Sequence, residues 1–213
     1  MVVPRCWKDA DAVAAMRDFL SQAPPRRAAI RGLMTELLSP EPFACRCAAD
    51  LARRVSAREP GILRHHADVL AGLAAELLPE QWQARGHVAM AAALNARTHV
   101  QRMRLAPLVR SLVEDERIAV RAMGLEAFAM LAQAEPELRD EAMLLLECSR
   151  RAHEPALRSR ARRMLPLLLA TEVEARSRSA IRQPELGGGA SLQRVGHQAR
   201  RIARPAARPQ ISG

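Results

Sequence analysis

The apolar positions of the chain recur at helical spacing, in segments separated by short breaks that carry proline or glycine. No run alternates valine, isoleucine, threonine and aromatic residues as a half-buried strand does. The pattern therefore predicts an all-α protein built from helical hairpins with short connections. Eight helices are expected at roughly 26–38, 43–57, 62–77, 80–95, 98–113, 117–133, 137–151 and 156–169, with a weaker pattern at roughly 9–20.

An apolar or small residue followed by arginine recurs near the start of every second predicted helix. The four arginines are separated by 36 to 39 residues, and they are Arg46, Arg85, Arg121 and Arg158. Three positions before them stand Phe43, Trp82, Ile118 and Pro155. A fixed period of this size predicts a solenoid of stacked repeats.

The third unit carries the motif most fully, in VEDERIAVRAMGLEAFAMLA, with Pro107 inside its first helix, Asp115 in the turn and Val120-Arg121 opening the second helix. In these features the chain resembles the HEAT-repeat family over roughly residues 26–169. The resemblance implies a right-handed α-solenoid of about four HEAT-like hairpins, with Asp115 and the four repeat arginines forming a ladder between units. The other units depart from the motif at the aspartate position, which is occupied by Pro40, Pro79 and Ala152.

Helical-wheel patterns set the expected limits of the folded part. The helix from Arg117 to Leu131 is apolar on most sides, so it needs neighbours on most sides. The last helix, Ala156 to Leu169, has one apolar face with arginines on much of the rest, as a terminal cap repeat does. We therefore expect a lead-in helix in 1–25, a repeat domain in 26–170 and a basic, disordered tail in 171–213, although a short amphipathic helix near Leu192 is an alternative.

Composition and charge are compatible with a binding protein. The chain has 49% hydrophobic and 2% aromatic residues and a formal charge of +10, and Lys8 is its one lysine. Arginine suits phosphate recognition, but this usage also follows from a GC-rich coding sequence. The start, MVVPRCWKDADAV, is not typical of a signal peptide, the longest bulky apolar run is too short for a membrane span, and the cysteines show no disulfide framework, so we expect a cytoplasmic protein.

One short segment, QWQARGHVAMAAAL, groups Trp82, Arg85 and His87. The wheel places Trp82 and Arg85 on a side of small residues and His87 on the opposite side among bulky ones, which predicts a core histidine with a hydrogen-bonded ring nitrogen. Two interpretations of Trp82 and Arg85 are open: they pack between repeats, or they face a concave groove as anchors for a peptide or base. Packing is favoured because Phe43 and Ile118 occupy the same repeat position as Trp82.

Catalytic and metal-binding patterns are weak. Adjacent His65-His66 point about 100° apart, and Cys45 and Cys47 lack CxxC spacing. The single pair His153-Glu154 is similar to one of several such pairs that a HEAT-like hydroxylase family uses to bind iron. We therefore predict a non-enzymatic protein without metal or cofactor. Glu126, the only charged residue deep in an apolar helix, is either a satisfied structural acid or the catalytic acid of a HEAT-like DNA-repair glycosylase.

The predicted function is that of a scaffold binding a protein or peptide on the concave face lined by the second helices. The candidate anchors are Trp82, Arg85, Arg46 and Arg121, though arginines of a ladder would be internal. The alternative is nucleic-acid binding, in which those arginines and the basic tail neutralise phosphates and affinity falls steeply with salt.

Overall fold

The computed structural model describes residues 9–22 and 26–182, and within them the chain is almost entirely helical, with no strand. The all-helical prediction is therefore confirmed. The chain first forms α1 (Asp9–Ser21), α2 (Arg27–Leu37), α3 (Pro42–Arg58), α4 (Ala67–Glu76) and α5 (Trp82–Asn95), followed by α6 (His99–Val113), α7 (Ile118–Ala134), α8 (Arg139–Arg150) and α9 (Pro155–Arg182). Single 3₁₀ turns precede α4, α5 and α8 at Arg64–His66, Pro79–Gln81 and Pro136–Leu138.

Proline and side-chain caps set the helix starts that the sequence predicted. Pro42 occupies the first turn of α3, where its missing N–H would have no helical partner, and Glu41 accepts a hydrogen bond from the backbone N–H of Phe43 at 3.0 Å. At α6, Thr98 and Gln101 form a capping box. These local signals are readable from residue types, which explains why most predicted starts lie within a few residues of the observed ones.

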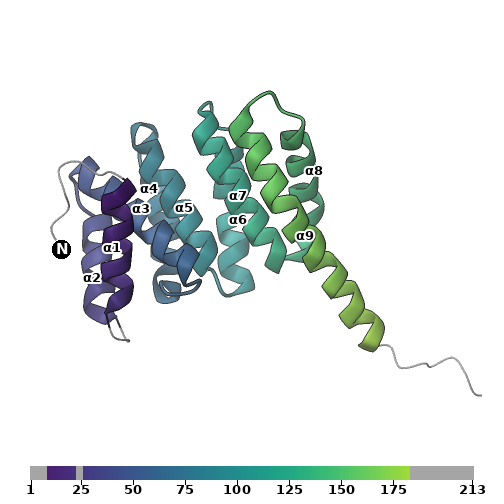
Figure 1. The fold of residues 1–213 in the computed structure, drawn as a ribbon, viewed down its shortest axis with the longest axis horizontal. Helices are drawn as coiled ribbons and strands as arrows, with labels where there is room; N and C mark the ends of the chain where they lie inside the picture. Colours follow the sequence, from purple (N-terminus) through teal and green to yellow (C-terminus); the bar gives the residue numbers. More distant parts are fainter. Residues whose placement is uncertain (1–8, 23–25, 183–213) are drawn as a thin grey trace, which may run out of the picture. The chain divides into compact units, whose positions relative to one another are not determined.

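The helices pack in two rows in chain order (Figure 1). One row has α3 against α5 and α5 against α7, and in the other α4 packs against α6. The hairpin partners α2 and α3, α4 and α5, α6 and α7 also contact each other. Because second helices contact second helices of the neighbouring hairpins, each must be apolar on several sides.

The chain divides into two units, Met1–Ala175 and Arg176–Gly213. Helix α1 packs on α3, so the predicted lead-in helix belongs to the first unit. Helix α9 continues past the predicted limit at residue 170, as far as Arg182. The remainder of the predicted tail, 183–213, lies outside the described residues.

Helix α7 is buried on most sides, as its wheel predicts. Leu125, Phe128 and Leu131 are fully buried, and the helix contacts α5, α6 and α8. Ile118, at its first turn, is 44% exposed, so the residue that shares the repeat position of Trp82 does not pack as a core residue. The apolar face predicted for α9 is confirmed by the buried side chains of Leu157, Ala161, Met164, Leu165 and Leu168.

Polar contacts link helices that lie about one repeat period apart. The pairs are Arg26 with Glu59, Arg46 with Gln83, Asn95 with Ser56, Arg102 with Glu135, and Arg163 with Glu126, separated by 33 to 39 residues along the chain. A separation near the period predicted from the arginines is what corresponding positions in adjacent repeats produce. These polar contacts therefore recur at a spacing close to the one predicted from the sequence.

Several arginines close the ends of preceding helices. Each donates from its guanidinium to a backbone carbonyl six residues earlier, and they are Arg26, Arg102, Arg139 and Arg158, which reach Leu20, Ala96, Gln133 and Ala152. Carbonyls at a helix end have no intrahelical partner and carry partial negative charge, so a cation stabilises them. Part of the arginine content therefore serves the fold.

Asn95 is fully buried and joins three segments. Its Nδ2 donates to Ser56 Oγ and to the Ala91 carbonyl, both at 2.7 Å, and its Oδ1 accepts from the Leu63 N–H at 2.7 Å.

We expect Asn95→Ala to lower the free energy of unfolding by about 2 kcal/mol, because buried partners lose their hydrogen bonds. Urea denaturation checks this, with Ser56→Ala as the milder control. A loss no larger than that of Ser56→Ala would contradict the role given to the amide.

Candidate functional site

A groove of ≈ 510 Å³ lies across α5, α7 and α9, three helices of the row formed by second helices. We call it the Trp82 groove. Its volume is within the range of pockets that hold small molecules or cofactors. It is lined by Trp82, Gln83, His87, Ala119, Ala122, Met123, Ala156, Ser159, Arg160 and Arg163.

Trp82 forms one wall of the groove and is also part of the packing. It opens α5 directly after the 3₁₀ turn Pro79–Gln81, and its half-buried ring packs against the core. The same side chain lines the groove. The two interpretations drawn from the sequence are therefore not exclusive. Trp82 is the first residue of α5, so one part of its large ring contacts the core while another part lines the groove.

His87 lies at the groove, so it is not the fully buried core histidine that the wheel predicts, and the predicted hydrogen bond is not made by its Nδ1. Its side chain is 22% exposed, and its buried Nδ1 has no hydrogen-bond partner among the described residues. The nearest carboxylate oxygen, Asp50 Oδ1, is 3.8 Å from Nδ1. Burial lowers the pKa of His87 to about 4; Asp50 opposes the shift, and Arg53 and Arg54 add to it. The imidazole is neutral at pH 7.

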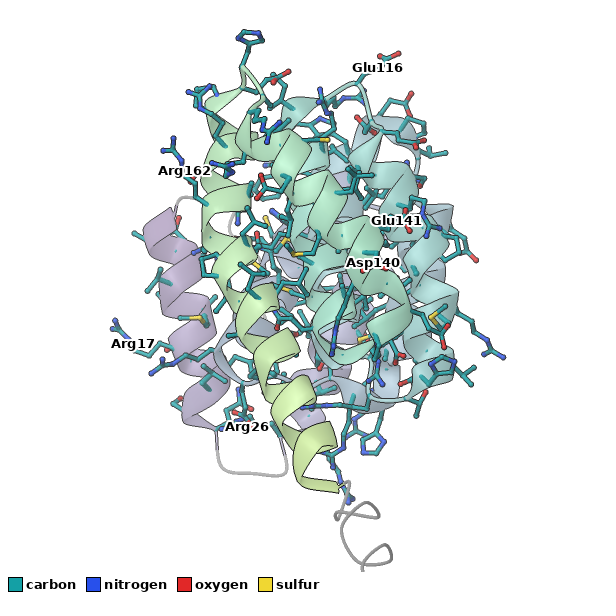
Figure 2. All side chains as sticks on the ribbon, turned by 90° about the vertical axis from the view of Figure 1, so that its right-hand side faces the viewer. Arg17, Arg26, Glu116, Asp140, Glu141 and Arg162 are labelled. Carbon is teal, nitrogen blue, oxygen red and sulfur yellow. The ribbon has the colours of Figure 1, made fainter. Side chains whose placement is uncertain are left out.

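Arg160 and Arg163 provide the charge of the groove, and sequence reasoning missed their role. They lie one turn apart on α9, and both donate to the carboxylate of Glu126, which is 5% exposed. Glu126 thereby has a partner for each oxygen, as the structural interpretation of this acid expects. The repeat period carried a signal, since Arg163 follows Glu126 by 37 residues. The intervening Arg162 is exposed and projects away from α9 (Figure 2).

The three other predicted anchors do not line the Trp82 groove. Arg46 lies 4.9 Å from the centroid of the Phe43 ring and donates to Gln83 Oε1 at 3.1 Å, beside a second pocket of ≈ 350 Å³. Arg85 Nε donates to the Ala74 carbonyl of α4 at 3.2 Å. Arg121 Nη1 is 3.6 Å from Glu154 Oε1. The four candidates therefore do not form one site.

The ladder implied by the HEAT resemblance has different partners here. Asp115 accepts a hydrogen bond at 2.8 Å from the N–H of Arg117, in its own turn, and no ion pair to a repeat arginine is found for it within the described residues. Between neighbouring units, Arg46 instead contacts Gln83 and Arg121 contacts Glu154. Asp115 thus stabilises the turn before α7.

The groups with chemical reactivity are not assembled into a site. Burial raises the pKa of the Cys45 thiol. It is also the main cause that raises the pKa of the Cys47 thiol to about 11, so both thiols are protonated at pH 7. Within residues 9–22 and 26–182, histidine, cysteine and acidic side chains form no group of three or more that would hold a metal ion.

Every helix of the described residues is too short or too polar to cross a lipid bilayer. Comparison of the chain with protein-family models, with curated proteins and with solved structures finds no match.

Proposed function

We propose that the chain is a non-enzymatic, HEAT-like right-handed α-solenoid of about four helical hairpins that binds a peptide segment of a partner protein in the Trp82 groove. The observation that carries this is the groove itself, which combines an aromatic ring, the apolar side chain of Met123 and two guanidinium groups on three successive second helices. Aromatic and arginine side chains are enriched among residues that dominate protein interfaces.

A peptide fits the groove better than a nucleic acid does. Sequence-independent DNA or RNA binding needs several guanidinium or ammonium groups free to neutralise successive phosphates. Here Arg160 and Arg163 are held by Glu126, and Arg102, Arg139 and Arg158 are directed to backbone carbonyls. The positive charge near the groove is therefore small, which suits a short segment with few charges.

The proposal is tested by selecting displayed random peptides on the immobilised full chain and measuring their affinity for variants. Ala156 and Ala119 are exposed residues that line the groove, so Ala156→Trp and Ala119→Trp should fill it. We expect either change to weaken the selected peptides about tenfold or more, a loss of at least ~1.4 kcal/mol. Ala75→Trp, on the exposed side of α4, is the matched control and should have no effect.

Two outcomes would count against the proposal. One is that no selected peptide is weakened by the groove-filling variants. The other is that labelled DNA or RNA binds, loses affinity steeply between ~50 and ~200 mM salt, and is blocked by Ala156→Trp, since this would assign the groove to phosphates.

A further inference from the structure

The lining of the Trp82 groove has an excess of positive charge. Arg160 and Arg163 line it, and no acidic side chain does. Behind them Glu126 provides one carboxylate for two guanidinium groups. The pair therefore presents about one uncompensated positive charge to the groove, because one carboxylate balances only one of the two cations.

A third guanidinium, that of Arg53 on α3, interacts with Arg160 but has its own carboxylate partner. Arg53 donates to Asp50 through Nη2 at 2.8 Å, but its buried Nε makes no hydrogen bond within the described residues. Burial lowers the pKa of Arg160, Glu126 opposes that shift, and the charges of Arg163 and Arg53 add to it. Arg53 is paired with Asp50 and does not line the groove, so the surplus charge of the lining remains that of Arg160 and Arg163 over Glu126.

We propose that the Trp82 groove takes a peptide that places one carboxylate against Arg160 and Arg163 and an adjacent apolar side chain against Trp82 and Met123. This rests on the proposed function and specifies its ligand. Guanidinium groups bind carboxylates through paired charge-assisted hydrogen bonds, and the single surplus charge matches one carboxylate. A partner peptide is favoured over the chain's own segment 183–213, because its five arginines and one glutamate give that segment the same sign of charge as the groove.

The test uses three fluorescein-labelled heptapeptides that alternate leucine with glutamate, with glutamine or with lysine, titrated against the full chain in about 100 mM salt and followed by anisotropy. The glutamate peptide should bind most tightly. Arg163→Gln should weaken it about tenfold, the loss of one charge-assisted contact. Arg162→Gln, the matched change at a neighbouring arginine that does not line the groove, should change affinity by less than about twofold, because its charge lies outside the contact.

A second variant changes affinity in the opposite direction. Glu126→Gln removes the internal carboxylate and releases both guanidinium groups, so the glutamate peptide should bind about tenfold more tightly. A variant that failed to fold would lose affinity, so misfolding cannot imitate this gain. Thermal melts of each variant accompany the titrations.

The inference is overturned if the glutamine peptide binds as tightly as the glutamate peptide, if Arg162→Gln weakens binding as much as Arg163→Gln, or if Glu126→Gln lowers affinity. If the glutamine or lysine peptide binds and Ala156→Trp blocks it while the glutamate peptide does not bind, the inference fails and the proposed function stands. If none of the three binds and display yields no groove-dependent peptide, both fail.

Discussion

Gly124→Leu should lower the free energy of unfolding by about 3 kcal/mol, because the side chain has no space between α6 and α7. A Cβ added at Gly124 would lie 2.8 Å from the Leu112 Cβ, 2.8 Å from the Val113 nitrogen and 2.9 Å from the Leu112 carbonyl carbon. Two of these atoms belong to the backbone of α6, so rotation of a side chain cannot relieve the clash. Urea or thermal denaturation measures the loss.

Gly32→Ala is the control for the helical propensity of glycine. A Cβ at Gly32, in α2, meets no atom within 4 Å, so this change should raise stability by about 0.5 to 1 kcal/mol. Gly124→Ala should destabilise despite the same gain in propensity. If both alanine variants were stabilised equally, the close approach of α6 and α7 at Gly124 would be refuted.

Acid should destabilise the protein through His87 before most carboxylates titrate. In the folded chain the pKa of His87 is lowered from 6.5 to about 4 by burial. At about pH 7.5 and above the imidazole is neutral in both states and has almost no effect. As pH falls from about 6.5 to about 4, the unfolded chain binds a proton that the folded chain does not, so stability is lost, up to about 3 kcal/mol.

The measurement compares wild type with His87→Gln by urea denaturation at several pH values from 7 to 4. All other titrating groups are shared, so the difference between the two proteins isolates His87. The wild type should lose stability relative to the variant as pH falls below about 6.5. Parallel pH profiles, or a histidine NMR titration with a midpoint near 6.5, would contradict the assignment.

The helices were predictable because their signals are local. The proline-containing breaks, the cap at Thr98 and the apolar stripe of α9 depend on residues within a turn or two of each other. The wheel of α7 also indicated correctly that this helix is surrounded. The end of α9 was not predictable in the same way. The apolar stripe that predicts this helix ends near residue 170, whereas the helix continues to Arg182.

The site was predictable only in part. Trp82 was recognised as an anchor or packing residue because aromatic residues are rare in this chain. In the structure it both packs against the core and lines the groove. Arg85 was placed beside it by the wheel, but its guanidinium turns back to the Ala74 carbonyl. A wheel gives the direction of the Cβ, whereas a long side chain reaches whichever acceptor the neighbouring helix provides.

The sequence by itself determined the helical class, the period of about 37 residues and the apolar faces, because these follow from spacing along one chain. Only the tertiary structure decided that Arg160 and Arg163 share Glu126 and that His87 lies in the groove with Trp82. Such contacts join three helices, and each depends on how the helices are rotated against one another. That rotation is set by the packing of all their side chains together, at positions such as Gly124 where two backbones meet.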